Sequence, residues 1–152
     1  MTLPDLTALD HFRVHLIAES HQRLTGRRLV DAADDMVAAL WHAPPVIVAH
    51  DTAPDPVFFF GNARALELFE MSFADFTRLP SRHSAEPMLQ ADRAKLLETV
   101  NRVGFIEDYA GVRISSTGKR FRISKAIVWN LIAEDGSKHG QAAAFSDWEP
   151  VD

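Results

Sequence analysis

The hydrophobic period of this chain changes at Pro44-Pro45, and this change limits the folds that the chain can adopt. Before the two prolines, apolar residues recur at the three- and four-residue spacing of amphipathic helices. After them come short β-branched and aromatic runs bounded by turn residues, which are typical of strands. Proline ends a helix because it has no backbone N–H to donate. The sequence therefore predicts two N-terminal helices followed by sheet-forming segments.

The order of the later segments predicts the fold class. Asn62 suits the N-cap of a central helix, because its side-chain oxygen can accept a free backbone N–H. Gly118 and Gly136 lie where hairpin connections need a positive φ. The predicted elements are helices at 3–24 and 29–41, strands at 46–50 and 57–60, helices after Asn62, at 72–76 and at 91–103, and strands at 105–114, 120–132 and 139–148. This order indicates an α+β fold, with a five-stranded antiparallel sheet and helices on one face.

Length and charge restrict the domain count and the partners. A chain of 152 residues is expected to form one core, so we predict a helical extension over residues 1–43 and a sheet domain over residues 44–152. The net charge of −5 argues against nucleic acid as a partner, since such binding relies on basic surfaces. No run of 18 apolar residues is present, so no membrane partner is expected. The N-terminus has no secretory pattern, which predicts a cytoplasmic location.

The residue types also bear on cofactors. Cysteine is absent, so a cysteinyl–flavin adduct and an iron–sulfur cluster are not expected. His11, His15 and Glu19 have a spacing that zinc can use, but they occupy the polar side of an amphipathic helix, and no metal site is predicted. His83 could ligate haem iron, yet its surroundings hold no haem-specific pattern, so haem is not expected either. The identity of any cofactor stays open.

Several segments of the last two thirds resemble a known family. The segments 111–120, 126–131, 134–135 and 145–148 resemble the MEKHLA domain, and the stretch 62–72 resembles the PAS segment that enters the first helix after the second strand. The resemblance spans about Pro45 to Pro150 and implies a PAS-like fold with a sensory or regulatory role. The N-terminal helices suit the stand-alone bacterial form. The plant form ends homeodomain–leucine-zipper transcription factors, and neither of those segments is present here.

The resemblance also implies where a ligand would bind. PAS-like domains that bind small molecules hold them between the sheet and the helices, so polar and aromatic residues predicted near that space are candidates. The candidates are His50, Asn62, Arg82, His83, Tyr109, Lys125, Trp129 and Trp148. Strand alternation puts Lys125 on the face of Trp129, which requires a β-bulge, a snorkelling lysine or a lysine that holds an anion. Arg82 and His83 could clamp an anion or belong to a solvated loop.

Three functions are compatible with these features. The first is a sensor that binds a small molecule. The second is a ligand-free interaction module that forms a homodimer through the apolar side of the first helix, with the interface at Leu6, Leu9, Phe12, Leu16 and Ile17. The third is a small enzyme that pairs His50 or His83 with Glu86. No nucleophile elbow or phosphate-binding loop occurs, so no catalytic residues are predicted and an enzyme is not favoured.

Overall fold

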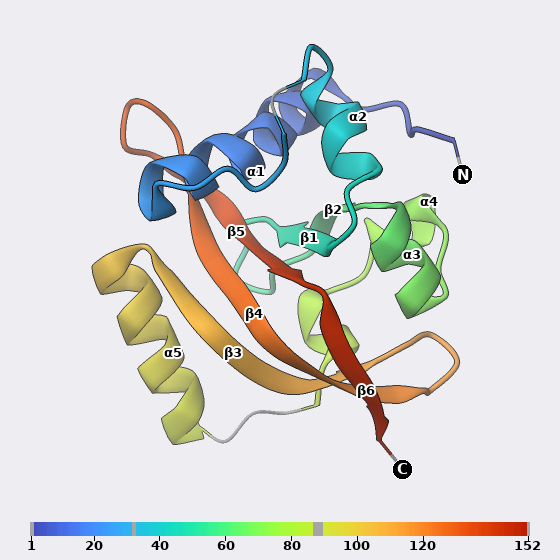
Figure 1. The fold of residues 1–152 in the computed structure, drawn as a ribbon. Helices are drawn as coiled ribbons and strands as arrows, with labels where there is room; N and C mark the ends of the chain where they lie inside the picture. The colour runs from blue at the N-terminus through green and yellow to red at the C-terminus, as the bar shows by residue number, and fades with distance from the viewer. Residues whose placement is uncertain (1, 32, 87–89, 152) are drawn as a thin grey trace.

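The computed structural model describes residues 2–31, 33–86 and 90–151, and Figure 1 shows the arrangement of its elements. In chain order they are α1 (Ala8–Thr25), α2 (Met36–Trp41), β1 (Val46–His50), β2 (Phe58–Gly61), α3 (Ala63–Phe69), α4 (Phe73–Phe76), the 3-10 helix η1 (Ser81–Ser84), α5 (Gln90–Val103), β3 (Phe105–Ile114), β4 (Arg120–Ile132), β5 (Lys138–Phe145) and β6 (Asp147–Val151). The predicted α+β class and element order are confirmed.

The two N-terminal helices begin at side chains that cap them. Thr7 accepts the N–H of Asp10 at 3.1 Å and starts α1, and Gly26 ends it with a φ of 74°. The second helix is shorter than predicted, because residues 29–31 and 33–35 are not helical. Asp35 accepts the N–H of Ala38 at 3.1 Å, and this cap starts α2 at Met36. Aspartate favours such caps over helix interiors, which explains the late start.

The sheet is antiparallel, with strand order β2-β1-β5-β4-β3 and with β6 paired to β4 outside this path. The last predicted strand is in fact two strands, since Ser146 separates β5 from β6. β5 pairs with β1 and with the second half of β4, whereas β6 pairs with the first half of β4, from Arg120 to Ser124. The residues predicted as one strand therefore form two strands that pair with different halves of β4.

A β-bulge interrupts β4 at Lys125. Gly111 of β3 pairs with Ile123 and Tyr109 pairs with Ala126, so β4 has one residue more than β3 between these two pairs. Lys125 has a φ of 54° and an exposed side chain. The bulge reading of the sequence is thus confirmed. Because side chains alternate along a strand, the extra residue exchanges the two faces of β4 beyond it.

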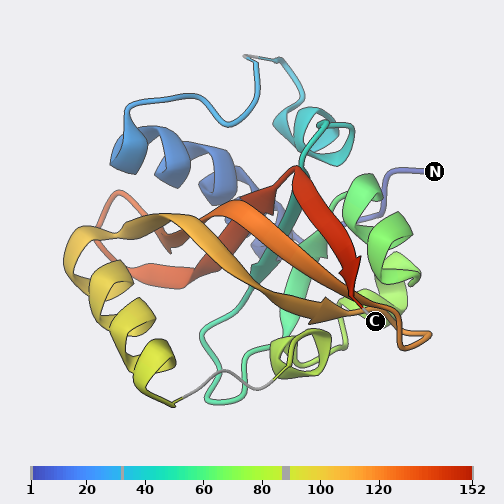
Figure 2. The ribbon, with the colours of Figure 1, turned by 60° about the horizontal axis from the view of Figure 1, so that its bottom comes forward.

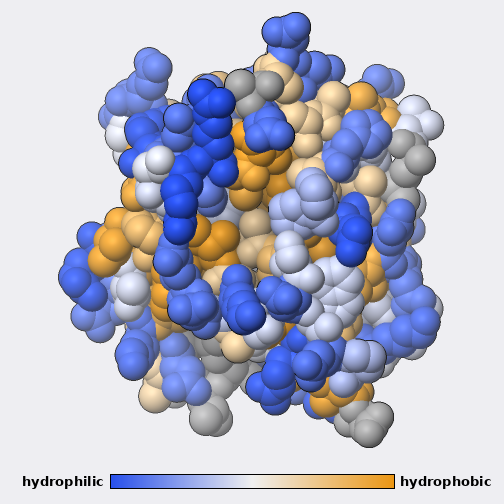
Figure 3. All heavy atoms as spheres, in the orientation of Figure 1, coloured by the Kyte–Doolittle hydropathy of each residue, from blue (hydrophilic) through white to orange (hydrophobic). Residues whose placement is uncertain are grey.

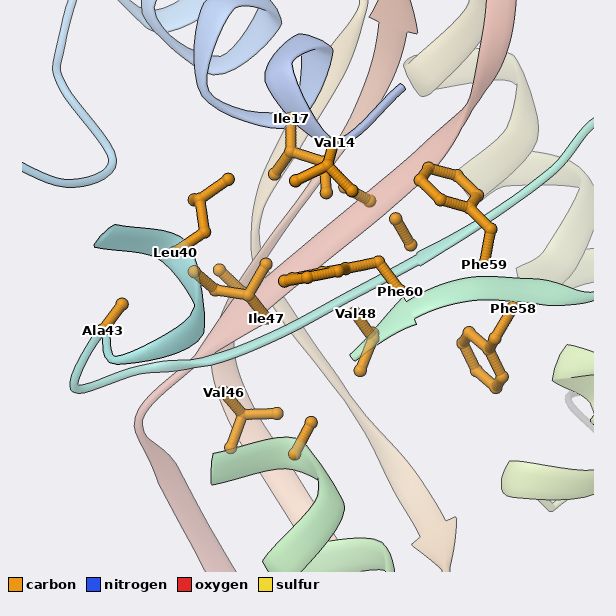
Figure 4. Close-up of a cluster of buried hydrophobic side chains, with 14 of the residues drawn as sticks. Val14, Ile17, Leu40, Ala43, Val46, Ile47, Val48, Phe58, Phe59 and Phe60 are labelled. Atoms are coloured by element: carbon orange, nitrogen blue, oxygen red, sulfur yellow. The ribbon is translucent and has the colours of Figure 1, made fainter. Parts of the chain in front are cut away.

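Helices cover both faces of the sheet (Figure 2). We call the side covered by α1 and α2 the α1 face, and the opposite side the cleft face. In Figure 4, Ile47, Phe59 and Phe60 lie toward Val14 and Ile17 of α1. The labelled side chains of Val46, Val48 and Phe58 point the other way. On the cleft face the ring of Phe76 in α4 stacks on Phe58, with centroids 4.3 Å apart.

In the view of Figure 3, hydrophilic side chains dominate, and hydrophobic side chains are visible in patches between them. Among the described helices, none combines the length and the apolar character needed to span a lipid bilayer.

Candidate functional site

An open cleft of about 1090 Å³ lies on the cleft face of the sheet. Its walls come from β1, β3, β4 and β5, from the loop between β1 and β2, and from η1 and α5. Its volume is slightly above the usual range for small-molecule sites, about 300–1000 Å³. The sheet supplies the floor, because alternate residues of each strand point to this side.

The lining combines an apolar floor with a polar margin. Apolar side chains of the floor include Val48, Phe58, Ile123, Val128 and Phe145, and Phe69 of α3 adds to the apolar lining. Polar side chains of the lining include His50, Arg82, Glu86, Tyr109, Arg113 and Gln141. A hollow of this composition suits a ligand with an apolar body and a few polar groups.

His50 lies at the end of β1, opposite Gln141 of β5. Its Nδ1 atom is 2.8 Å from the carbonyl oxygen of Asp51, which orients the ring. Burial in the cleft lowers the pKa of His50 below its ordinary value of 6.5, although the hydrogen bond to Asp51 and the side chain of Gln141 act in the opposite direction. The imidazole is therefore neutral at pH 7 and offers one donor and one acceptor.

Arg82 and Tyr109 also line the cleft, as the sequence predicts for ligand-site candidates, whereas His83 does not. Arg82 is exposed and donates to the carboxylate of Asp55 at 3.0 Å. His83 is exposed on η1 and is absent from the cleft wall. The predicted anion clamp of Arg82 and His83 is not assembled, because the carboxylate of Asp55 already occupies the arginine.

Asn62 has a structural role in place of the predicted position in the cavity. It is fully buried, and its Oδ1 accepts the N–H groups of Ile47 at 3.1 Å and Ala65 at 3.0 Å. Its Nδ2 donates to the carbonyl oxygens of Leu40 at 3.1 Å and Pro45 at 2.9 Å. These four contacts use the hydrogen-bonding capacity that a ligand would need.

Trp129, Lys125 and Trp148 also lie outside the cleft wall. Trp129 is fully buried on the α1 face, where its indole Nε1–H donates to the carbonyl oxygen of Ile17 at 3.1 Å. Alternation without a bulge would place it beside Ile123, so the extra residue at Lys125 explains the difference. Trp148 lies in β6 opposite Ile123, with the guanidinium of Arg64 over its ring.

The five predicted interface residues fall into two groups. Leu16 and Ile17 are buried in the core, and Leu6 is partly buried against it, because this side of α1 packs on the sheet. They are not available to a second copy. Leu9 and Phe12 lie on the same side of α1 as Leu16, seven and four residues before it, but they are exposed, by 57% and 45%.

Among the polar residues of the cleft that sequence reasoning missed are Arg113 and Gln141. Both could be found from strand alternation. Arg113 lies two and four residues after Gly111 and Tyr109 on the same face of β3, and Gln141 lies two residues before Ala143 of the cleft wall.

The histidine–glutamate pair considered for an enzyme is only partly assembled. His50 and Glu86 both line the cleft, but the carboxylate of Glu86 forms an ion pair with Arg120.

Comparison with protein families and with individual sequences identifies relatives of this chain. A family model described as the MEKHLA domain matches residues 11–150. Homeobox-leucine zipper protein HOX10 of Oryza sativa subsp. indica is 29% identical in an alignment 123 positions long that covers 78% of this chain and 14% of that protein. HOX32 of Oryza sativa subsp. japonica is 26% identical in an alignment 149 positions long that covers 93% of this chain and 17% of that protein. The chain thus spans only about a sixth of these relatives.

Solved structures share the fold. A PAS domain from Colwellia psychrerythraea superposes with a TM-score of 0.61 at 13% identity, over 75% of this chain and 92% of that one. A light-oxygen-voltage domain, studied with a flavin analogue, gives a TM-score of 0.58 at 15% identity, over 77% of this chain and 84% of that one. At these identities the likeness is one of fold.

Proposed function

Because this chain belongs to the MEKHLA domain family and has a PAS-type fold, we propose that it is a sensory or regulatory domain that binds a small molecule in the cleft. The observation that carries the proposal is the cleft itself, about 1090 Å³ with an apolar floor and a polar margin. A folded domain that only needed a core would fill such a hollow with side chains.

The two faces of β4 provide a route from ligand to output. Val128 lines the cleft, whereas its neighbour Trp129 donates to Ile17 of α1 on the other face. Ser20 of α1 also accepts the N–H of Ile132 at 2.9 Å. A ligand that binds one arrangement of β4 more tightly than another would shift the docking of α1 by that difference in affinity.

Native mass spectrometry and an absorption spectrum of gently purified protein test for a bound molecule. A metabolite panel should then raise the melting temperature. A ligand at 100 times its Kd adds about 2.7 kcal/mol, or about 5–10 °C for a domain of this size. Ala143→Phe, on the cleft wall, should abolish the shift, and Ala8→Phe, on the exposed start of α1, should leave it unchanged. No adduct and no shift across the panel would refute ligand binding.

A second candidate function is homodimerisation through α1, favoured by the exposed apolar side chains of Leu3, Leu9 and Phe12. Contiguous exposed apolar surface is a common sign of an interaction site. Leu9→Asp with Phe12→Asp should convert a dimer to a monomer in light scattering after size exclusion. Leu97→Asp changes a comparably exposed leucine of α5 and should not. A wild-type chain that stays monomeric at high concentration would refute this candidate.

A further inference from the structure

Three residues of β3 shape one end of the cleft. Tyr109, Gly111 and Arg113 alternate along the strand, and all three line the cleft. A β-carbon at Gly111 would lie 3.0 Å from the Tyr109 hydroxyl, so the tyrosine ring lies across the glycine. The guanidinium carbon of Arg113 is 5.7 Å from the centre of the same ring. The hydroxyl of Tyr109 and the guanidinium of Arg113 therefore both lie at this end of the cleft.

Neither of these polar groups has a protein acceptor among the described residues. Tyr109 and Arg113 are both half-buried, and apart from their mutual ring contact neither side chain forms a hydrogen bond or an ion pair within the described part of the chain. Neither group is among the buried side-chain atoms without a partner in the described residues, so both are accessible from the cleft and free to bind a ligand. The other arginine of the wall, Arg82, is paired with Asp55.

Most carboxylates of the cleft wall are engaged by other groups. Asp51 accepts the N–H groups of Ala53 and Val57 at 3.1 and 3.0 Å, and Glu86 is paired with Arg120. Asp92 lines the wall from the exposed first turn of α5. The charge of Arg113 is thus open to a ligand anion.

Apolar surface adjoins this end of the cleft. Ile123 is paired with Gly111, and Phe121 is paired with Arg113. Val128 continues the floor beyond the bulge. A ligand held at Arg113 would therefore place the rest of its body over aliphatic and aromatic side chains.

We propose that the cleft binds an amphipathic monocarboxylate, whose carboxylate is held by the Arg113 guanidinium and the Tyr109 hydroxyl and whose apolar body lies over Ile123 and Val128. This inference rests on the proposed function and names its ligand class. A guanidinium matches the planar geometry of a carboxylate and can donate two parallel hydrogen bonds to it. A single positive charge matches a single negative one, whereas a phosphate dianion would face Glu86 and Asp92 with excess charge.

Isothermal titration of the full chain with octanoate and 3-phenylpropionate, each beside its neutral alcohol, tests the proposal. The acids should bind more tightly than the alcohols. Arg113→Gln should weaken the acids by about tenfold or more, the usual value of a hydrogen bond to a charged group, and leave the alcohols unchanged. Tyr109→Phe should weaken the acids by less. Arg102→Gln changes an exposed arginine of α5 and should have no effect.

Arg113→Lys guards against loss of folding in the glutamine variant, since it keeps the charge and removes the planar fork. It should bind the acids with intermediate affinity. Equal binding of acids and alcohols, or tighter binding of octyl phosphate, would overturn the carboxylate assignment and leave the proposed function standing. Absence of binding by every probe, together with no native adduct, would overturn both.

Discussion

Replacing Asn62 by alanine tests whether one buried amide joins three segments of the chain. The side chain makes four hydrogen bonds, to the backbones of Ile47, Ala65, Leu40 and Pro45. A buried hydrogen bond contributes about 1 kcal/mol net, so losing all four should cost about 4 kcal/mol. Domains of this kind are stable by about 5–15 kcal/mol, so the variant should fold but be weakened severely.

Urea unfolding followed by tryptophan fluorescence measures this cost. With a slope of about 2 kcal/mol per molar urea, the midpoint should fall by about 2 M. Ser72→Ala is the matched control, because Ser72 also caps a helix but, within residues 2–31, 33–86 and 90–151, its side chain accepts only the N–H of Asp75, at 3.1 Å. It should cost about 1 kcal/mol and about 0.5 M.

Asn62→Asp separates the two halves of the amide. The aspartate keeps an acceptor for Ile47 and Ala65 but loses both donors, and its charge faces the carbonyl oxygens of Leu40 and Pro45. At neutral pH it should be at least as unstable as the alanine variant. If Asn62→Ala shifts the midpoint no further than Ser72→Ala, the contacts beyond the helix cap contribute nothing and the reasoning fails.

Three further predictions concern backbone strain and pH. Lys125→Gly should stabilise by about 1 kcal/mol in urea unfolding, because a φ of 54° suits glycine, and Lys125→Val should destabilise. Hydrogen bonds from Thr117 and Ser115 lower the pKa of Glu70 to about 2. The contribution of this carboxylate to the free energy of unfolding is therefore complete above pH 4.5 and is lost as the pH falls toward 2. Glu70→Gln should make the free energy of unfolding depend less on pH in that window. Burial lowers the pKa of His50, so stability should fall as the pH drops below 6.5, and less steeply in His50→Gln.

Local chemistry made the order of elements predictable. Pro44-Pro45 ends the helical part, Gly26 ends α1, and Asn62 caps α3, and each of these residues acts within a few positions of itself. The same holds for the bulge at Lys125, which was one of three explanations that strand alternation allowed for this residue. Signals of this kind need no knowledge of distant parts of the chain.

The contents of the cleft depended on distant parts of the chain. His50 and Gln141 are opposite each other only because β1 pairs with β5, although the two residues are 91 positions apart in the chain. Asn62 was a good N-cap, but its contacts to Leu40 and Pro45 need the chain to return on itself. The position of Trp129 required the exact length of the bulge, and the burial of Leu16 required α1 to lie on the sheet.

The bulge at Lys125 divides β4 into two halves, in which side chains of opposite numbering, odd or even, point toward the cleft. Odd-numbered Ile123 lines the cleft before the bulge and even-numbered Val128 lines it after the bulge, while odd-numbered Trp129 lies on the other face and bonds to Ile17 of α1. The number of residues between Ile123 and Val128 therefore matters more to the fold than which residues they are. Substitutions there should be tolerated far better than a single insertion or deletion, which would turn one half-strand inside out.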